Sequence, residues 1–161
     1  MVFYYGRYIR NFLNMKLKLD HIGVVVKDIR KSYNHYNQTF GFKRITKIIY
    51  EPAHKVKVLF LSFGSGSMPV LELVMPTSKK SKVSNFLKNK GEGFHHYAYE
   101  VKEINKAINA LKKKNCFLIS DIVPGAGHNK TNTAWLISEK KDLIELVEKQ
   151  KNKSGLNRFT K

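Results

Sequence analysis

Apolar and polar residues alternate along residues 17–26, and beyond this stretch the apolar spacing changes from that of a strand to that of a helix. His21 lies on one face of the predicted strand together with every second residue. Asp28 follows as a good N-cap, apolar residues recur at helical spacing as far as Phe40, and Gly41 is expected to end the helix. Three further β-type segments complete a predicted βαβββ unit, at 42–51, 56–63 and 69–74.

The second half of the chain repeats the pattern of the first. His96 takes the place of His21 at an offset of 75 residues, and Glu145 takes the place of Glu72 at an offset of 73. The sequence therefore indicates one unit used twice, with one histidine on its first strand and one glutamate on its last. The second unit is expected to contain strand 94–101, helix 103–114 and strands 116–123, 133–138 and 143–148.

The repeat predicts an α+β fold in which two tandem βαβββ modules form a curved mixed sheet around a central metal cavity. A single domain is expected over residues 17–149, with modules 17–76 and 93–149 joined by a linker helix within 77–92. Residues 1–16 stand outside the repeat as an N-terminal extension, and residues 150–161 form a basic C-terminal tail that is expected to fray.

Composition narrows the class of protein. The hydrophobic fraction of 42% is sufficient for a core, and no apolar run approaches the length of a membrane span. Residues 1–16 do not resemble a signal peptide, and Cys116 is the only cysteine, which fits a reducing compartment and predicts a cytoplasmic location. The net charge of +18 suggests either a polyanionic partner or a lysine-rich solvated surface. Scattered lysines and few arginines favour the surface, so nucleic acid is not the expected partner.

The paired histidines and glutamates carry the candidate chemistry. A single histidine on a strand is usually structural, but a carboxylate among apolar residues needs a partner or a metal because burying an unpaired charge is costly. Two equivalent units facing each other bring equivalent positions together. We therefore expect Zn²⁺, Ni²⁺, Co²⁺, Mn²⁺ or Fe²⁺ to be bound, with positions left for water or substrate. The predicted ligands are His21, Glu72, His96 and Glu145.

Three other histidines receive weaker assignments. Strict alternation places His95 on the opposite face of its strand from His96, as a core residue or a support for the ligands. His54 and His128 fall in predicted loops at the mouth of the cavity, where a solvated position is the expectation. The glycine-rich loop 124–130, which carries His128, is either a substrate-contact loop or a plain flexible hairpin.

Several stretches resemble the vicinal oxygen chelate superfamily, which includes glyoxalase I, extradiol dioxygenases and bleomycin-resistance proteins. Within it, residues 17–149 are most similar to the methylmalonyl-CoA epimerases. The matching stretches are Leu19–Val26, Val56–Leu61, Leu71–Pro76, Lys90–Val101 and Ile144–Glu148. The resemblance implies the paired βαβββ fold, a divalent metal on the four predicted ligands, a small-molecule carboxylate or CoA thioester as substrate, and a homodimer.

The resemblance also implies a mechanism, in which a carboxylate removes an α-proton beside a thioester and the metal stabilises the resulting enolate. Glu145 is the first candidate for this catalytic base and Glu72 the second. Lys57 stands where some epimerases carry a further glutamate, so it is a candidate substrate-binding residue together with His128. The alternatives are a glyoxalase I-like lactoylglutathione lyase, or a metal-free small-molecule-binding protein of the resistance type.

Overall fold

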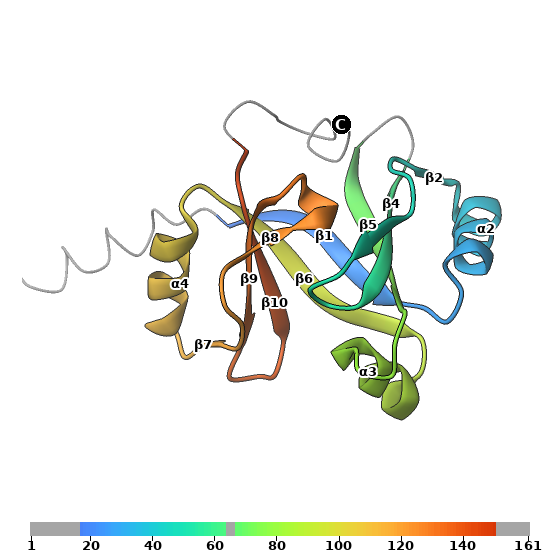
Figure 1. Ribbon diagram of the computed structural model, residues 1–161. Helices are drawn as coiled ribbons and strands as arrows, with labels where there is room; N and C mark the ends of the chain where they lie inside the picture. Colours follow the sequence, from blue (N-terminus) through green and yellow to red (C-terminus); the bar gives the residue numbers. More distant parts are fainter. Residues whose placement is uncertain (1–16, 64–66, 151–161) are drawn as a thin grey trace, which may run out of the picture.

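A computed structural model of the chain describes residues 17–63 and 67–150 (Figure 1). The N-terminal extension 1–16, part of the glycine–serine connection (64–66) and residues 151–161 of the basic tail lie outside the described residues. The first half contains β1 (Lys18–Val25), α2 (Ile29–Phe40), β2 (Phe42–Arg44), β3 (Ile49–Glu51), β4 (Val56–Phe63) and β5 (Ser67–Pro76).

The second half follows a linker that contains the helix α3 (Lys82–Lys90). Its elements are β6 (Gly93–Val101), α4 (Ile104–Lys112), β7 (Phe117–Leu118), β8 (Val123–Gly125), the 3₁₀ turn η1 (Ala126–His128), β9 (Thr131–Ile137) and β10 (Leu143–Glu148). The predicted α+β class is confirmed. Among the described residues, no helix is long and apolar enough to cross a membrane.

The strands of the described chain belong to one mixed sheet, whose main path runs β2-β4-β5-β1-β6-β10-β9-β7. At its centre β1 pairs in parallel with β5, and β6 pairs in parallel with β10, while β1 and β6 are antiparallel. The two halves therefore meet at the β1–β6 pair and are arranged symmetrically about it. The helices α2 and α4 lie on opposite sides of the molecule, and α3 lies below the central strands in this view (Figure 1).

Local chemistry explains why the first helix begins and ends where predicted. The Asp28 carboxylate accepts hydrogen bonds from the backbone N–H groups of Arg30 and Lys31, at 2.9 and 3.0 Å. Gly41 adopts the left-handed conformation (φ 78°) that commonly ends a helix. Ile29 at the start of the helix is buried in the hydrophobic cluster formed with β4 and β5, so the helix is held against the sheet by its apolar face.

The predicted strand 116–123 is the clearest departure from the expected elements. It divides into the short strands β7 and β8. Between them, the hydroxyl of Ser120 accepts the backbone N–H of Trp135 at 2.9 Å, in place of a ladder carbonyl. A side chain that substitutes for the backbone in this way interrupts the regular strand.

Candidate metal centre and its cavity

The four predicted ligands lie on the four central strands of the sheet, one on each. Glu72 is on β5, His21 on β1, His96 on β6 and Glu145 on β10. All four residues are buried, and one potential ligand atom from each lies within 4.8 Å of the others. The structure thus gathers at one point the residues that the repeat selected from distant parts of the sequence.

The spacing of these atoms fits a metal site. His21 Nε2 lies 3.2 Å from His96 Nε2, 3.4 Å from Glu72 Oε2 and 3.3 Å from Glu145 Oε2. His96 Nε2 lies 3.4 Å from the same Glu72 oxygen and 3.7 Å from the same Glu145 oxygen. Bonds of about 2.0–2.2 Å to a tetrahedral ion place neighbouring donor atoms roughly 3.3–3.6 Å apart. Two imidazoles and two carboxylates at this spacing therefore suit a divalent cation.

The register of the β1–β6 pair, which is similar in the two halves, explains how the sheet brings the histidines together. Across the β1–β6 pair, His96 lies opposite Gly23 and His21 lies opposite Ala98. Each histidine therefore faces a small residue of the other half. The fit is tightest at Gly23, where an added Cβ would stand 1.9 Å from Cε1 of the His96 ring, so the absence of a side chain at this position makes room for the ring.

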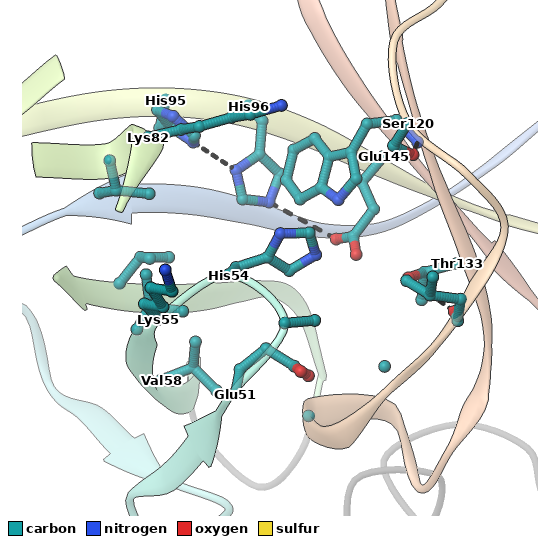
Figure 2. A pocket seen from close by; sticks show the side chains of 18 of the residues that line it. Glu51, His54, Lys55, Val58, Lys82, His95, His96, Ser120, Thr133 and Glu145 are labelled. Atoms are coloured by element: carbon teal, nitrogen blue, oxygen red, sulfur yellow. Dashed lines mark hydrogen bonds and ion pairs between the residues drawn. The ribbon is translucent and has the colours of Figure 1, made fainter. Parts of the chain in front are cut away.

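Each of the two histidines also has a hydrogen-bond partner on its Nδ1 atom. His21 Nδ1 donates to Asp20 Oδ2 at 2.9 Å, and His96 Nδ1 lies 2.9 Å from His95 Nδ1. Alternation predicted His95 on the face away from His96, and this is wrong, since both line the same cavity. Figure 2 shows the two rings side by side, with His96 pointing toward Glu145.

Burial and neighbouring charges shift the pKa values of the clustered residues and of His95. Burial opposes protonation of His21, but its hydrogen bond to Asp20 and the Glu145 and Glu72 carboxylates raise its pKa well above the usual value. Burial acts to raise the pKa of Glu72, yet the hydrogen bonds and charges of His21 and His96 hold that pKa below its usual range. Burial, aided by His96, lowers the pKa of His95 to about 4.

Three of the four clustered residues, Glu72, His96 and Glu145, line a cavity of about 500 Å³. Some of the lining residues are apolar and others are basic, and the basic ones come from the β3–β4 turn, from α3 and from the turn before α3. Figure 2 places Lys55 and Lys82 around this cavity together with Glu51 and His54. The apolar lining residues include Val56, Val58, Val74 and Val83, and the lysines are Lys55, Lys80 and Lys82. Such a lining can hold a small molecule with apolar and anionic parts.

His128 is not in a solvated loop, which corrects the expectation for this residue. It is 5% exposed, its ring stacks on His21 with centroids 5.3 Å apart, and its Nε2 lies 3.8 Å from Glu145 Oε2. The η1 turn holds it there, because Gly127 packs closely against Phe60. Glycine in this loop therefore indicates close packing of the backbone rather than a flexible hairpin.

The structure does not bring Lys57 to the cavity. Its side chain is exposed on β4, between Val56 and Val58, which do line the cavity. Neighbouring residues of a strand point to opposite faces, so Lys57 points away from the four-residue cluster. His54, expected to be solvated, is half-buried and lines the cavity, where its ring contacts Trp135 with centroids 5.9 Å apart.

Sequence reasoning missed three side chains that surround the cluster. Asp20 is fully buried against His21. Trp135 packs edge-on against His96, with ring centroids 4.7 Å apart. Glu51 lines the cavity, and its carboxylate accepts the backbone N–H of Ala126. The signal for Asp20 was present in the sequence, as a carboxylate directly beside a histidine in an otherwise apolar strand.

Comparison with known proteins adds a family likeness. The model of the Glyoxalase/Bleomycin resistance protein/Dioxygenase superfamily matches residues 20–133. The mitochondrial methylmalonyl-CoA epimerase of Mus musculus is 34% identical over 114 residues, which cover 70% of this chain and 62% of that enzyme. The matched stretch therefore spans less than two thirds of this relative.

Solved structures of other proteins are also similar to this chain. A hypothetical protein from Bacillus halodurans C-125 is 31% identical, with a TM-score of 0.74 and coverage of 87% of this chain and 99% of that one. The methylmalonyl-CoA epimerase of Streptomyces coelicolor, in complex with 2-nitronate-propionyl-CoA, is 25% identical, with a TM-score of 0.67 and coverage of 83% and 98%.

Proposed function

Because the chain belongs to the Glyoxalase/Bleomycin resistance protein/Dioxygenase superfamily, we propose that it is a metal-dependent epimerase of the methylmalonyl-CoA epimerase type. The observation that carries this proposal is the buried set of two histidines and two glutamates around one point, at the wall of a cavity large enough for a small molecule. The 34% identity to a named epimerase supports the reaction class, and the CoA ligand of the Streptomyces coelicolor enzyme supports a CoA thioester as substrate.

The proposed ligands are His21, Glu72, His96 and Glu145, and the donor set suits Zn²⁺, Ni²⁺, Co²⁺, Mn²⁺ or Fe²⁺. A divalent ion held there would supply Lewis acidity to the oxygens of a thioester and a carboxylate, which favours loss of the α-proton between them. Without a cation, two buried carboxylates close together would be costly.

The proton transfers are assigned to the chain's own carboxylates. We propose Glu145 as the first candidate for the base that takes the α-proton from one face of the substrate. Glu72, which lies in the other half of the sheet, is the second candidate for the same role. A second acid then returns a proton to the opposite face of the same carbon, which inverts the centre. His128 lies 3.8 Å from the Glu145 carboxylate, where its imidazole can contact the substrate or stabilise the charge of the base.

The basic part of the cavity lining suits the anionic groups of the substrate. Lys55, Lys80 and Lys82 all line the cavity, and ammonium groups bind phosphates and carboxylates as point charges. We propose that these lysines, rather than Lys57, contact the CoA portion.

Hydrogen exchange at the substrate's α-carbon tests the reaction. Metal-loaded protein in D₂O is expected to replace the α-proton of racemic methylmalonyl-CoA with deuterium, as followed by NMR, and a Glu145→Gln variant is expected to exchange far more slowly. No exchange with metal-loaded wild type rules out this substrate. Thioester formation from a glutathione hemithioacetal would instead favour the glyoxalase-type lyase.

Two further proposals concern the assembly and the location of the protein, the first implied by the family resemblance and the second by the single cysteine, Cys116. One is a homodimer, which sedimentation equilibrium of the purified chain tests directly. The other is a cytoplasmic location, which is tested by cell fractionation followed by detection of the native protein.

A further inference from the structure

The antiparallel β1–β6 pair contains one extra residue on each strand. Leu19 and His21 pair with the adjacent residues Tyr99 and Ala98, which leaves Asp20 as the extra residue of β1. On β6 the pairing passes from His96 directly to Phe94, which leaves His95 as the extra residue. Both irregularities are β-bulges, and each extra residue directly precedes one of the two histidines of the cluster.

The bulges change which way these side chains point. In a regular strand, consecutive residues lie on opposite faces, so neither Asp20 nor His95 could reach its neighbour's ring. With a bulge, Asp20 lies beside His21 and His95 lies beside His96, and both pairs are joined through Nδ1 at 2.9 Å. Two halves of a duplicated chain thus use the same backbone device at the same place.

The hydrogen bonds decide which nitrogen each histidine presents to the cluster. An imidazole whose Nδ1 carries the proton has its lone pair on Nε2. The Nε2 atoms of His21 and His96 lie 3.2 Å apart and face Glu72 and Glu145. For His96 to offer this lone pair, its Nδ1–H must donate to Nδ1 of a neutral His95.

We propose that Asp20 and His95 are positioning residues that fix the Nε2-coordinating tautomers of His21 and His96. This inference rests on the proposed function, since it concerns the same metal site. The two supports differ in charge: Asp20 is a fully buried carboxylate, whereas His95 accepts as a neutral ring at the cavity wall. A carboxylate behind a ligand raises the basicity of the imidazole, so His21 is the stronger of the two nitrogen ligands.

Matched variants separate the role of the hydrogen bond from that of packing. Asp20→Ala removes the acceptor, whereas Asp20→Asn keeps an oxygen acceptor and loses the charge. His95→Phe keeps a ring against Phe86, whose ring centroid lies 4.9 Å from that of His95 in the wild type. His95→Gln instead keeps a hydrogen-bond acceptor. Loss of such a support weakens metal binding by roughly 10- to 100-fold. We expect losses of this size for Asp20→Ala and His95→Phe, with partial recovery in Asp20→Asn and His95→Gln.

Titration of metal-free protein with Co²⁺ alone gives the affinities, and NMR of the Co²⁺ protein gives a signature that packing alone does not produce. Wild type is expected to show two exchangeable, paramagnetically shifted Nδ1–H resonances. His95→Phe should lose one of these resonances to solvent exchange and Asp20→Ala the other, with far-UV circular dichroism unchanged. If Asp20→Ala does not fold, a reduced Co²⁺ affinity of Asp20→Asn tests the role of Asp20 instead.

The outcomes distinguish this inference from the metal site itself. Wild type that binds no stoichiometric Co²⁺ overturns the proposed metal site and the inference with it. Wild type that binds one Co²⁺ per chain, together with folded Asp20 and His95 variants that keep full affinity and both resonances, overturns the inference alone.

Discussion

Gly23 lies opposite the imidazole of His96 in the β1–β6 ladder, so close that a methyl group at position 23 would stand 1.9 Å from the ring. The contact joins the two halves of the chain at the candidate metal site. At the equivalent place in the other half, Ala98 lies opposite His21 and carries the methyl group that Gly23 lacks. The two halves are therefore equivalent in topology but not in packing.

Adding a methyl group at this contact is predicted to displace His96 from the cluster. Gly23→Ala should weaken Co²⁺ binding by at least about 100-fold, because one of four ligands loses its position. The matched control is Ala98→Gly, which removes a methyl group from the symmetric position and should cost about 1 kcal/mol of stability while metal affinity is kept. Equal affinities of Gly23→Ala and wild type, by calorimetric titration, would show that the ring is free to move.

The pKa of His95 predicts how the stability of metal-free protein depends on pH. This pKa is lowered from 6.5 to about 4, so between these values the unfolded chain binds a proton that the folded chain does not. Stability contributed by the neutral ring is therefore present above pH 6.5 and is lost as the pH falls toward 4. In His95→Gln, the free energy of unfolding should rise less steeply with pH than in wild type, and the two slopes should differ by at most about 1.4 kcal/mol per pH unit. Urea unfolding from pH 4.5 to 6.5, in the presence of chelator, measures both slopes; superimposable curves would argue against a buried neutral His95.

His128 is predicted to affect the reaction more than the metal. His128→Phe keeps a ring to stack on His21 and to contact Phe60, but it removes the nitrogen beside Glu145. We expect kcat for epimerisation to fall by roughly 100-fold, the lower end of the range for loss of a group that assists proton transfer, while the metal content stays at the wild-type level. Steady-state kinetics with metal analysis of the same samples checks this. A variant that loses metal in proportion to activity would place His128 among the ligands or their supports.

The cavity lysines are predicted to determine binding of the CoA thioester. Lys55→Gln and Lys82→Gln should each raise KM by roughly two- to fivefold, the effect expected for one partly exposed ion pair, and added salt should reduce the difference. Lys57→Gln provides the control, because Lys57 lies on the same hairpin but points away from the cavity. A KM change in the Lys57 variant as large as in the other two would mean that only the overall charge of the protein matters.

The sequence predicted the repeated elements and the four clustered residues because both depend on simple periodicities. His21 and His96 stand at the same place in two copies of one pattern, and a symmetric sheet brings such positions together. Asp20 was not predicted as a support, and His95 was considered as one but placed on the wrong face, because strict alternation assumes an unbroken strand. Asp20 and His21 are adjacent polar residues in an otherwise apolar strand, and the bulge in β1 lets both side chains lie together.

The burial of His128 was missed for a different reason. Its glycine-rich surroundings were interpreted by composition as a solvated loop, whereas Gly127 allows the backbone to pack on Phe60 and Val58. Close packing of this kind depends on contacts between segments far apart in the chain. Similarly, the position of Lys57 followed from the resemblance alone, and only the pleat of β4 reveals the face on which its side chain lies.

Elemental analysis of protein purified without a nickel column tests the central claim most directly. Wild-type protein should contain close to one equivalent of a divalent transition metal per chain, and His96→Ala, purified in parallel, should contain much less because one of the four ligands is gone. Wild-type protein that neither contains nor takes up such a metal, or a His96→Ala variant with full occupancy, would contradict the account.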